Sequence, residues 1–227
     1  MNALIMDGTA AGDAGAAAVK AVLVEHLGNA GWQLDDWVLR ETRMAPCDGD
    51  FGCWIKTPGQ CVHADAGRDV SRRMTAADLV VLFTRVTFGG FSYELKKAVD
   101  HAIPALMPWL QEQGGQTGHP MRYEHEPALL GVGLAAGDDG EPARVFAAQV
   151  ARMASNLSPR RHGAVVCDPR AGGQEIGRRL DAALAAAGLA TPAAAGLATP
   201  AAAGPAAAAA TGPAAPTAPD GDRVEVA

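Results

Sequence analysis

The chain has 227 residues, enough for one domain or about one and a half at roughly 150 residues per domain. Its formal charge is −6 and it holds no run of basic residues, which argues against nucleic-acid binding. No apolar stretch before the tail approaches the roughly 18 residues that span a membrane. The opening segment MNALIMDGTAAG lacks the basic and apolar regions of a signal peptide. We therefore expect a cytoplasmic protein that does not contact a membrane.

The composition changes near residue 185, where an alanine-rich repeat begins. The segment AAAGLATP occurs twice in succession and then fades into a sequence of Ala, Pro and Gly without an aromatic residue. Such a sequence offers too little apolar variety to offset the entropy of ordering, and its prolines interrupt any helix that alanine favours. We expect a folded domain over residues 1–188 and a disordered, low-complexity tail over residues 189–227.

Short apolar runs alternate with helical patterns through the rest of the chain. Strands are expected at residues 3–7, 37–39, 78–84, 128–135 and 163–167, and helices at 14–29, 69–77, 92–110 (kinked or divided by Pro104), 141–157 and 173–187. The strand sequences are near-continuous apolar runs, which is typical of parallel strands buried on both faces. This order favours an α/β fold: a flavodoxin-like, doubly wound, five-stranded parallel sheet with helices on both faces.

The topology also predicts where a ligand binds. In an open parallel sheet, ligands lie beyond the carboxyl ends of the strands, beside the point where the strand order reverses. The loops at 8–14, 84–92 and 135–140 each follow an expected strand and contain glycine or small polar residues. We therefore expect these three loops to form the binding site.

The first of these loops, GTAAGDAGA at 8–16, stands between a strand and a helix. Backbone N–H groups at such a helix start can hold a phosphate. The loop matches neither the dinucleotide fingerprint nor the P-loop, so ATP or a dinucleotide held in those modes is disfavoured. A tight glycine turn without a ligand is the alternative. The candidate cofactor-binding residues of this loop are Thr9, Asp13, Ala14, Gly15 and Ala16.

The second loop, TRVTFGGFS at 84–92, places two consecutive glycines between two aromatic residues. Glycines there let the backbone approach a flat ligand, on which Phe88 or Phe91 packs. An ordinary turn would not need two bulky aromatic side chains. The candidate cofactor-binding residues here are Thr84, Arg85, Val86, Thr87, Phe88, Gly89 and Gly90.

Three further blocks of sequence are distinctive: CDGDFGCWIKTPGQC at 47–61, AADLVVLFTRVTFGGFSYELKKAVDHAIP at 76–104 and TGHPMRYEHEP at 117–127. Together they resemble the NAD(P)H-dependent FMN reductase family of the flavodoxin-like superfamily. The resemblance extends over residues 1–185. It implies non-covalently bound FMN, reduction by NAD(P)H and a homodimer with FMN near the interface. FMN would lie across the three loops with its phosphate at the first.

The chain departs from this family at three places. Its first loop is rich in Ala and Gly where relatives carry Ser and Thr, Arg85 replaces a proline, and His101 replaces an arginine. A guanidinium at position 85 has three possible roles. It stabilises a reduced, anionic flavin ring, or it pairs with the phosphate of the cofactor or of NADPH, or it forms an ordinary surface ion pair.

Three of the four cysteines fall within one segment, at 47, 53 and 61. Iron–sulfur flavoproteins of the superfamily use four closely spaced cysteines, and zinc would need a fourth ligand, for which His63 is the nearby candidate. Because the fourth cysteine, Cys167, is distant, we expect no metal and reduced, structural cysteines near the flavin.

These observations support three hypotheses of different class. The leading one is an FMN-dependent oxidoreductase that moves electrons from NAD(P)H to flavin, quinone or another small acceptor. The cofactor supplies the chemistry, so no side chain is expected to be catalytic. The alternatives are a flavodoxin-type electron carrier and a degenerate module that has lost FMN. No pair of histidines at helical spacing or nucleophile motif supports a hydrolase.

Overall fold

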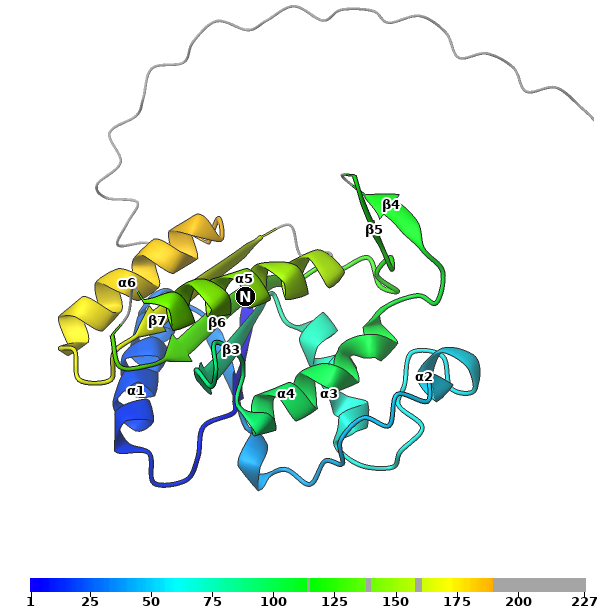
Figure 1. The fold of residues 1–227 in the computed structure, drawn as a ribbon, viewed down its shortest axis with the longest axis horizontal. Coiled ribbons are helices and arrows are strands. Elements are labelled where there is room, and N and C mark those ends of the chain that lie inside the picture. The colour runs from blue at the N-terminus through cyan, green and yellow to red at the C-terminus, as the bar shows by residue number, and fades with distance from the viewer. Residues whose placement is uncertain (114, 138–139, 158–160, 190–227) are drawn as a thin grey trace, which may run out of the picture. The chain divides into compact units, whose positions relative to one another are not determined.

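Five parallel strands form a single sheet in the order β2-β1-β3-β6-β7 (Figure 1). This is a computed structural model, and it describes residues 1–113, 115–137, 140–157 and 161–189. The strands of the sheet are β1 (Asn2–Asp7), β2 (Gln33–Val38), β3 (Leu79–Arg85), β6 (Ala128–Leu134) and β7 (His162–Cys167). The predicted flavodoxin-like, doubly wound sheet is therefore confirmed. The predicted tail lies outside the described residues from 190 onward.

Helices cover both faces of the sheet. The helices are α1 (Ala14–Asn29), α2 (Gly52–Ile55), α3 (Gly67–Ala76), α4 (Tyr93–Val99), α5 (Glu141–Asn156) and α6 (Gly173–Ala186). Apolar residues of α1 and α6 pack with alternate residues of the strands on one face, and those of α3, α4 and α5 pack on the other. None of the helices in the described part of the chain combines the length and hydrophobicity that crossing a membrane requires.

The central strands are apolar because their side chains point alternately to the two faces of the sheet, and helices bury both faces. In β3, Val81 packs on the face of α1, whereas Val80 and Leu82 pack on the opposite face. The second strand differs from the one predicted at residues 37–39: β2 begins at Gln33, and Leu39 lies after its end. The near-continuous apolar pattern does not extend to this edge strand, where Gln33, Asp35 and Asp36 are exposed. There Trp37 is covered by the Arg73 guanidinium, 4.0 Å from the ring centroid.

The predicted long helix over 92–110 is shorter in the structure. The α-helix ends at Val99 and continues as a 3-10 helix, η2 (Asp100–Ala105), which contains Pro104. The division predicted from that proline is therefore confirmed, but residues 106–110 lie outside any helix.

Three short features of the structure were not predicted from the sequence. They are α2 within the cysteine segment, the 3-10 helix η1 (Leu39–Glu41), and an antiparallel hairpin of β4 (Gln111–Gln113) and β5 (Gln116–Gly118). Each helix and each strand among them is at most four residues long, too short for a periodic pattern to reveal.

Glycines in β6 allow α5 to lie directly on the sheet. A Cβ atom at Gly131 would stand 2.4 Å from Cγ2 of Val150, and one at Gly133 would stand 3.0 Å from Phe146. Val150 and Phe146 are completely buried. The close approach of α5 to β6 therefore depends on the missing side chains.

We predict that Gly131→Ala lowers the free energy of unfolding by about 1–3 kcal/mol, the usual cost of overpacking a filled core. The matched control is Gly28→Ala in α1, where nothing lies within 4 Å of the added Cβ. The control should be neutral or stabilising, because alanine favours a helix. Urea unfolding measures both, and equal midpoints for the two variants would contradict this packing.

Candidate functional site

The loops that follow four strands meet at the carboxyl edge of the sheet. Main-chain bonds join each loop start to the neighbouring strand: Gly8 N–H donates to Phe83 O (2.9 Å), Val86 N–H to Leu134 O (3.0 Å) and Ala135 N–H to Cys167 O (3.2 Å). The strand order reverses between β1 and β3. The structure therefore brings the predicted loops at 8–14 and 84–92 together at the position where such sheets bind ligands. The third predicted loop, at 135–140, begins on the same edge, and its residues 138–139 lie outside the described part of the chain.

A buried carboxylate at the end of β1 holds the first loop in place. Asp7, the last residue of β1, accepts bonds from the Thr9 hydroxyl (2.6 Å) and main-chain N–H (2.8 Å), and from Lys20 Nζ (2.7 Å). Burial alone would raise the pKa of Asp7, but the bonds from Lys20 and Thr9 outweigh it and lower the pKa. The Thr9 hydroxyl proton is thus directed at Asp7 and not at a ligand above the loop.

The carboxylate of Asp13 occupies the start of α1. It accepts a hydrogen bond from Ala16 N–H (2.9 Å) as the N-cap of the helix. Arg85 donates two hydrogen bonds of 2.6 Å to the same carboxylate, from Nε and from one terminal nitrogen. A Cβ atom at Gly15 would lie 2.8 Å from Pro169 and 3.2 Å from Arg85, so the loop after β7 closes over this corner.

This ion pair has a direct electrostatic consequence. The bonds from Arg85 lower the pKa of Asp13 to about 2, from an ordinary value of 3.8. A carboxyl with a lowered folded-state pKa stabilises the fold above its unfolded pKa and loses that contribution as the pH falls. The Asp13–Arg85 pair therefore stabilises the fold above about pH 4 and is lost between there and about pH 2. Of the three roles open to Arg85, the structure shows an ion pair between the two predicted loops.

The loop after β3 forms a tight turn. Thr87 and Gly90 exchange two main-chain bonds of 3.0 and 2.8 Å, and Phe88 and Gly89 have positive φ angles of 49° and 78°. A Cβ atom at Gly89 would stand 2.5 Å from Val145 of α5. The glycine is thus required by the turn and by α5, which is a different reason from the predicted approach of a ligand.

The two aromatic residues of this turn have different environments. The Phe88 side chain is fully exposed, whereas Phe91 is buried and packs edge to face on Phe146 with ring centroids 5.9 Å apart. Phe91 belongs to the core, and of the two only Phe88 is free to cover a flat ligand.

The polar residues on either side of the turn hold it in place. The buried Thr84 hydroxyl donates to Arg85 O (2.9 Å) and accepts from Ser92 N–H (2.9 Å). Ser92 caps α4 and donates to Gly8 O (2.6 Å), which ties this loop to the first one. The sequence analysis did not single out Ser92, although a serine directly before a helical pattern is a recognisable cap signal.

The structure also brings the loop after β7 into the site, which the sequence analysis missed. Asp168 accepts a bond from Gly137 N–H (3.1 Å) and pairs with Arg170 (2.6 Å), and that pair lowers the pKa of Asp168. Its position directly after the last predicted strand was the available signal.

The remaining predicted site residues lie at the same edge and contribute main-chain groups, not polar side chains. Ala14, Gly15 and Ala16 form the first turn of α1, with Ala16 buried, and Val86 lies partly buried beside Gly133.

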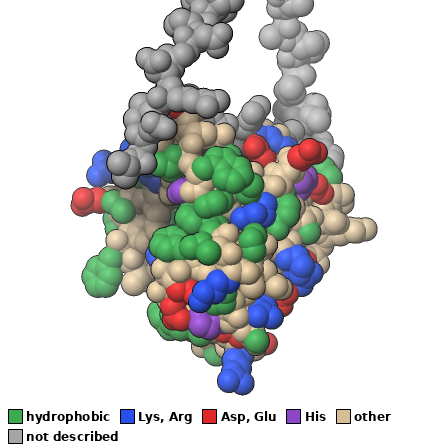
Figure 2. All heavy atoms as spheres, turned by 90° about the vertical axis from the view of Figure 1, so that its right-hand side faces the viewer, with side chains coloured by type: hydrophobic (Ala, Val, Ile, Leu, Met, Phe, Trp, Pro, Cys, Tyr) green, Lys and Arg blue, Asp and Glu red, His purple; other side chains and the backbone are tan. Residues whose placement is uncertain are grey.

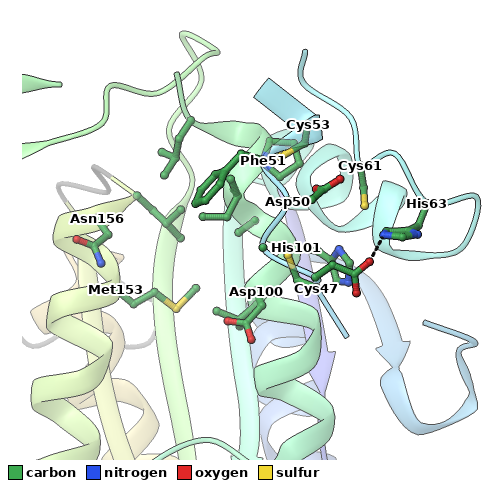
Figure 3. A pocket seen from close by; sticks show the side chains of 18 residues that line it. Cys47, Asp50, Phe51, Cys53, Cys61, His63, Asp100, His101, Met153 and Asn156 are labelled. Atoms are coloured by element: carbon green, nitrogen blue, oxygen red, sulfur yellow. Dashed lines mark ion pairs between the residues drawn. The ribbon is translucent and has the colours of Figure 1, made fainter. Parts of the chain in front are cut away.

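The three clustered cysteines are free thiols elsewhere in the fold. Cys47, Cys53 and Cys61 line one pocket beside α4 and η2 (Figure 3), and no residue of the turn at 87–90 lines that pocket. Among the described residues, no group of three His, Cys, Asp or Glu side chains is arranged to hold a metal ion. Cys167 is buried in the sheet.

Comparison with solved structures identifies proteins of the same fold. An FMN-dependent NADH-azoreductase from Bacillus anthracis, solved with FMN, is 12% identical with a TM-score of 0.57, over 84% of this chain and 100% of that one. An NAD(P)H:quinone oxidoreductase from Methanothermobacter marburgensis is 14% identical with a TM-score of 0.56, over 83% and 98%. An azoreductase from Bacillus anthracis str. Sterne is 13% identical with a TM-score of 0.55, over 85% and 97%.

No model of a known protein family matches the chain, and no curated protein matches it. At identities this low, the structural similarity establishes a shared fold alone. That fold agrees with the flavodoxin-like architecture described above.

We predict that Arg85→Ala raises the pKa of Asp13 from about 2 toward 3.8, because its main cationic partner is removed. Carboxyl ¹³C chemical shifts followed through an acid titration measure this value. The control is Arg40→Ala, since Arg40 lies on the same edge but bonds to Thr9 O and Glu41. An unchanged Asp13 titration in Arg85→Ala would show that the pair does not form in solution.

Proposed function

We propose that the chain is an FMN-dependent oxidoreductase that takes hydride from NAD(P)H and passes electrons to flavin, quinone or another small acceptor. The observation that carries the proposal is the carboxyl edge, where Arg85 and the turn at Thr87–Gly90 stand beside the start of α1. The shared fold with an FMN-bound azoreductase supports it, as does the resemblance of the three sequence blocks to FMN reductases.

The residues at this edge fit the FMN phosphate with one rearrangement. The Arg85 guanidinium offers donors in a fixed plane that match a phosphate, and the N–H groups at the start of α1 offer more. In the structure the Asp13 carboxylate holds both Arg85 and Ala16 N–H. We propose that phosphate replaces Asp13 as the partner of Arg85, so that the positive charge of Arg85 remains neutralised by an anion.

The turn after β3 is the proposed place of the flavin ring. Phe88 is exposed above the turn and presents a free aromatic face. Thr84, Val86, Thr87, Gly89 and Gly90 hold this turn against α5 and β6, so the turn is preorganised before a ligand arrives.

When bound, FMN supplies the chemistry of accepting a hydride and releasing electrons singly or in pairs. The chain's residues would bind and orient the cofactor. Arg85 would balance the phosphate charge, and Asp7, held ionised by Lys20, would keep the first loop in shape. No side chain of the site is assigned an acid, base or nucleophilic role.

We further propose that the protein acts in the cytoplasm as a homodimer on small molecules, and not on nucleic acid or at a membrane. The large apolar residues Phe88, Tyr93 and Val145 are exposed at or beside the β3 loop. They would give a second copy an apolar surface to cover.

Anaerobic titration of the FMN-reconstituted protein tests this function. NAD(P)H should bleach the visible flavin spectrum directly, and an added quinone should restore it. Bleaching only through a separate reductase would identify an electron carrier and contradict the proposal. A protein that remains colourless after incubation with excess FMN would be a module that has lost the cofactor.

We predict that Asp13→Asn tightens FMN binding by about tenfold, because the carboxylate that competes with phosphate for Arg85 is neutralised. Asparagine retains the N-cap bond, so α1 keeps its start. Riboflavin, which has no phosphate, is the matched control ligand and should bind both proteins equally. Quenching of flavin fluorescence measures the four dissociation constants, and equal FMN affinity for both proteins would contradict the exchange.

A further inference from the structure

A pocket of about 400 Å³ lies on the face of the sheet covered by α3, α4 and α5, at the far end of α4 from the carboxyl edge (Figure 3). One wall is the irregular segment that carries the three clustered cysteines. The others are η2 and the last turn of α5, which supplies Met153 and Asn156. Its volume lies within the range that binds small organic molecules.

The walls of the pocket are mainly apolar. Phe51 comes from the cysteine segment, Val99, Ile103 and Leu106 from α4, η2 and the residue after it, and Met153 from α5. Burial raises the pKa of Cys53 and of Cys61, and neighbouring acidic groups add to the effect. Neutral thiols behave as small apolar groups, so the sulfur atoms extend the apolar wall.

The charges around this pocket are of one sign. Asp48, Asp50 and Asp100 line it, whereas none of its lining residues is lysine or arginine. Asp48 pairs with His63 at 2.7 Å, and Asp100 pairs with Lys96 on the exposed side of α4. A ligand with a phosphate or carboxylate would meet acidic side chains here and no lysine or arginine among the lining residues.

The irregular wall is fastened to the domain by hydrogen bonds. Trp54 Nε1 donates to Ile103 O (3.2 Å) and Leu106 O (3.0 Å), and Arg68 donates to Cys61 O (3.0 Å) and Val62 O (2.9 Å). The buried His101 bonds to Ala45 O (2.8 Å). Because these bonds fix the wall, the pocket is preformed and does not need a ligand to shape it.

The side of the molecule that carries α2, whose Cys53 lines the pocket, also exposes apolar side chains. Figure 2 views the side of the molecule that carries α2 and the β4–β5 hairpin, and shows apolar side chains gathered between charged ones. Ile55 of α2 and Trp109 and Leu110, just before β4, are among the exposed large apolar residues.

We propose that this pocket is a second ligand site, which binds an uncharged or cationic, largely apolar small molecule and excludes anions. It is separate from the proposed flavin edge, because the seven residues of α4 place Tyr93 about 10 Å from the pocket end of the helix. The size, the apolar wall and the single sign of charge together define the class of ligand.

Two fluorescent probes that share a ring system test the proposal: neutral N-phenyl-1-naphthylamine and its sulfonated relative 1-anilinonaphthalene-8-sulfonate. Titration of the full chain without flavin should give at least about tenfold tighter binding of the neutral probe. Asn156→Trp, an exposed residue that lines the pocket, should abolish binding of the neutral probe. Ala148→Trp places the same side chain on an exposed, non-lining position of α5 and should leave binding unchanged.

Alkylation of the thiols gives a second, independent readout. Saturating neutral probe should slow the modification of Cys47 and Cys53 by N-ethylmaleimide, as mapped by mass spectrometry, in wild type and Ala148→Trp only. Equal affinity for both probes, or equal binding by both tryptophan variants, would overturn the proposal. Because no flavin is present, either result leaves the proposed oxidoreductase function untouched.

Discussion

The ion pair between Asp13 and Arg85 links the two segments on which a ligand at the carboxyl edge would depend. Asp13 begins α1, and Arg85 ends β3, so the pair fixes the helix start against the central strand. Both groups are partly exposed, so the pair contributes less to stability than its geometry alone suggests. Its larger effect is on specificity, because an anion entering this corner must compete with a carboxylate already in place.

The same residues explain how a chain with an alanine-rich first loop keeps the local structure of this edge. Loops rich in Ser and Thr offer hydroxyl groups to a phosphate, and this chain retains one hydroxyl there, which Asp7 engages. Arg85 and the main-chain N–H groups remain as the available donors. The proposed phosphate site thus consists of the Arg85 guanidinium and main-chain N–H groups. Its affinity for FMN depends on whether the Asp13 carboxylate gives up its bonds to Arg85.

The sequence was sufficient to predict that five strands alternate with helices and that three loops follow the strands, although the bounds of β2 and α4 differ from those expected. Those predictions depended on long apolar runs and helical periodicity, which leave a clear pattern in DLVVLFT or in residues 141–157. The bond between Asp13 and Arg85 could not be predicted, because it joins residues 72 apart and depends on the side-chain directions in two loops. The pocket of the cysteines was missed for a similar reason, since α5 and η2 complete it from distant parts of the chain.

Gly89 shows how a sequence motif is misinterpreted when its tertiary contacts are unknown. Consecutive glycines between aromatic residues suggested space for a ligand, but Gly89 is required by its φ angle and by Val145. In that motif Phe88 is the residue whose position core packing does not explain, because its side chain is fully exposed.

A crystal structure of the chain with FMN tests the central claim most directly, because it shows the phosphate and both charged groups together. The account predicts that the phosphate lies on Arg85 and the N–H groups at the start of α1, with the Asp13 carboxylate turned away from both. A bound FMN whose phosphate lies elsewhere, with the bonds between Asp13 and Arg85 intact, would contradict it.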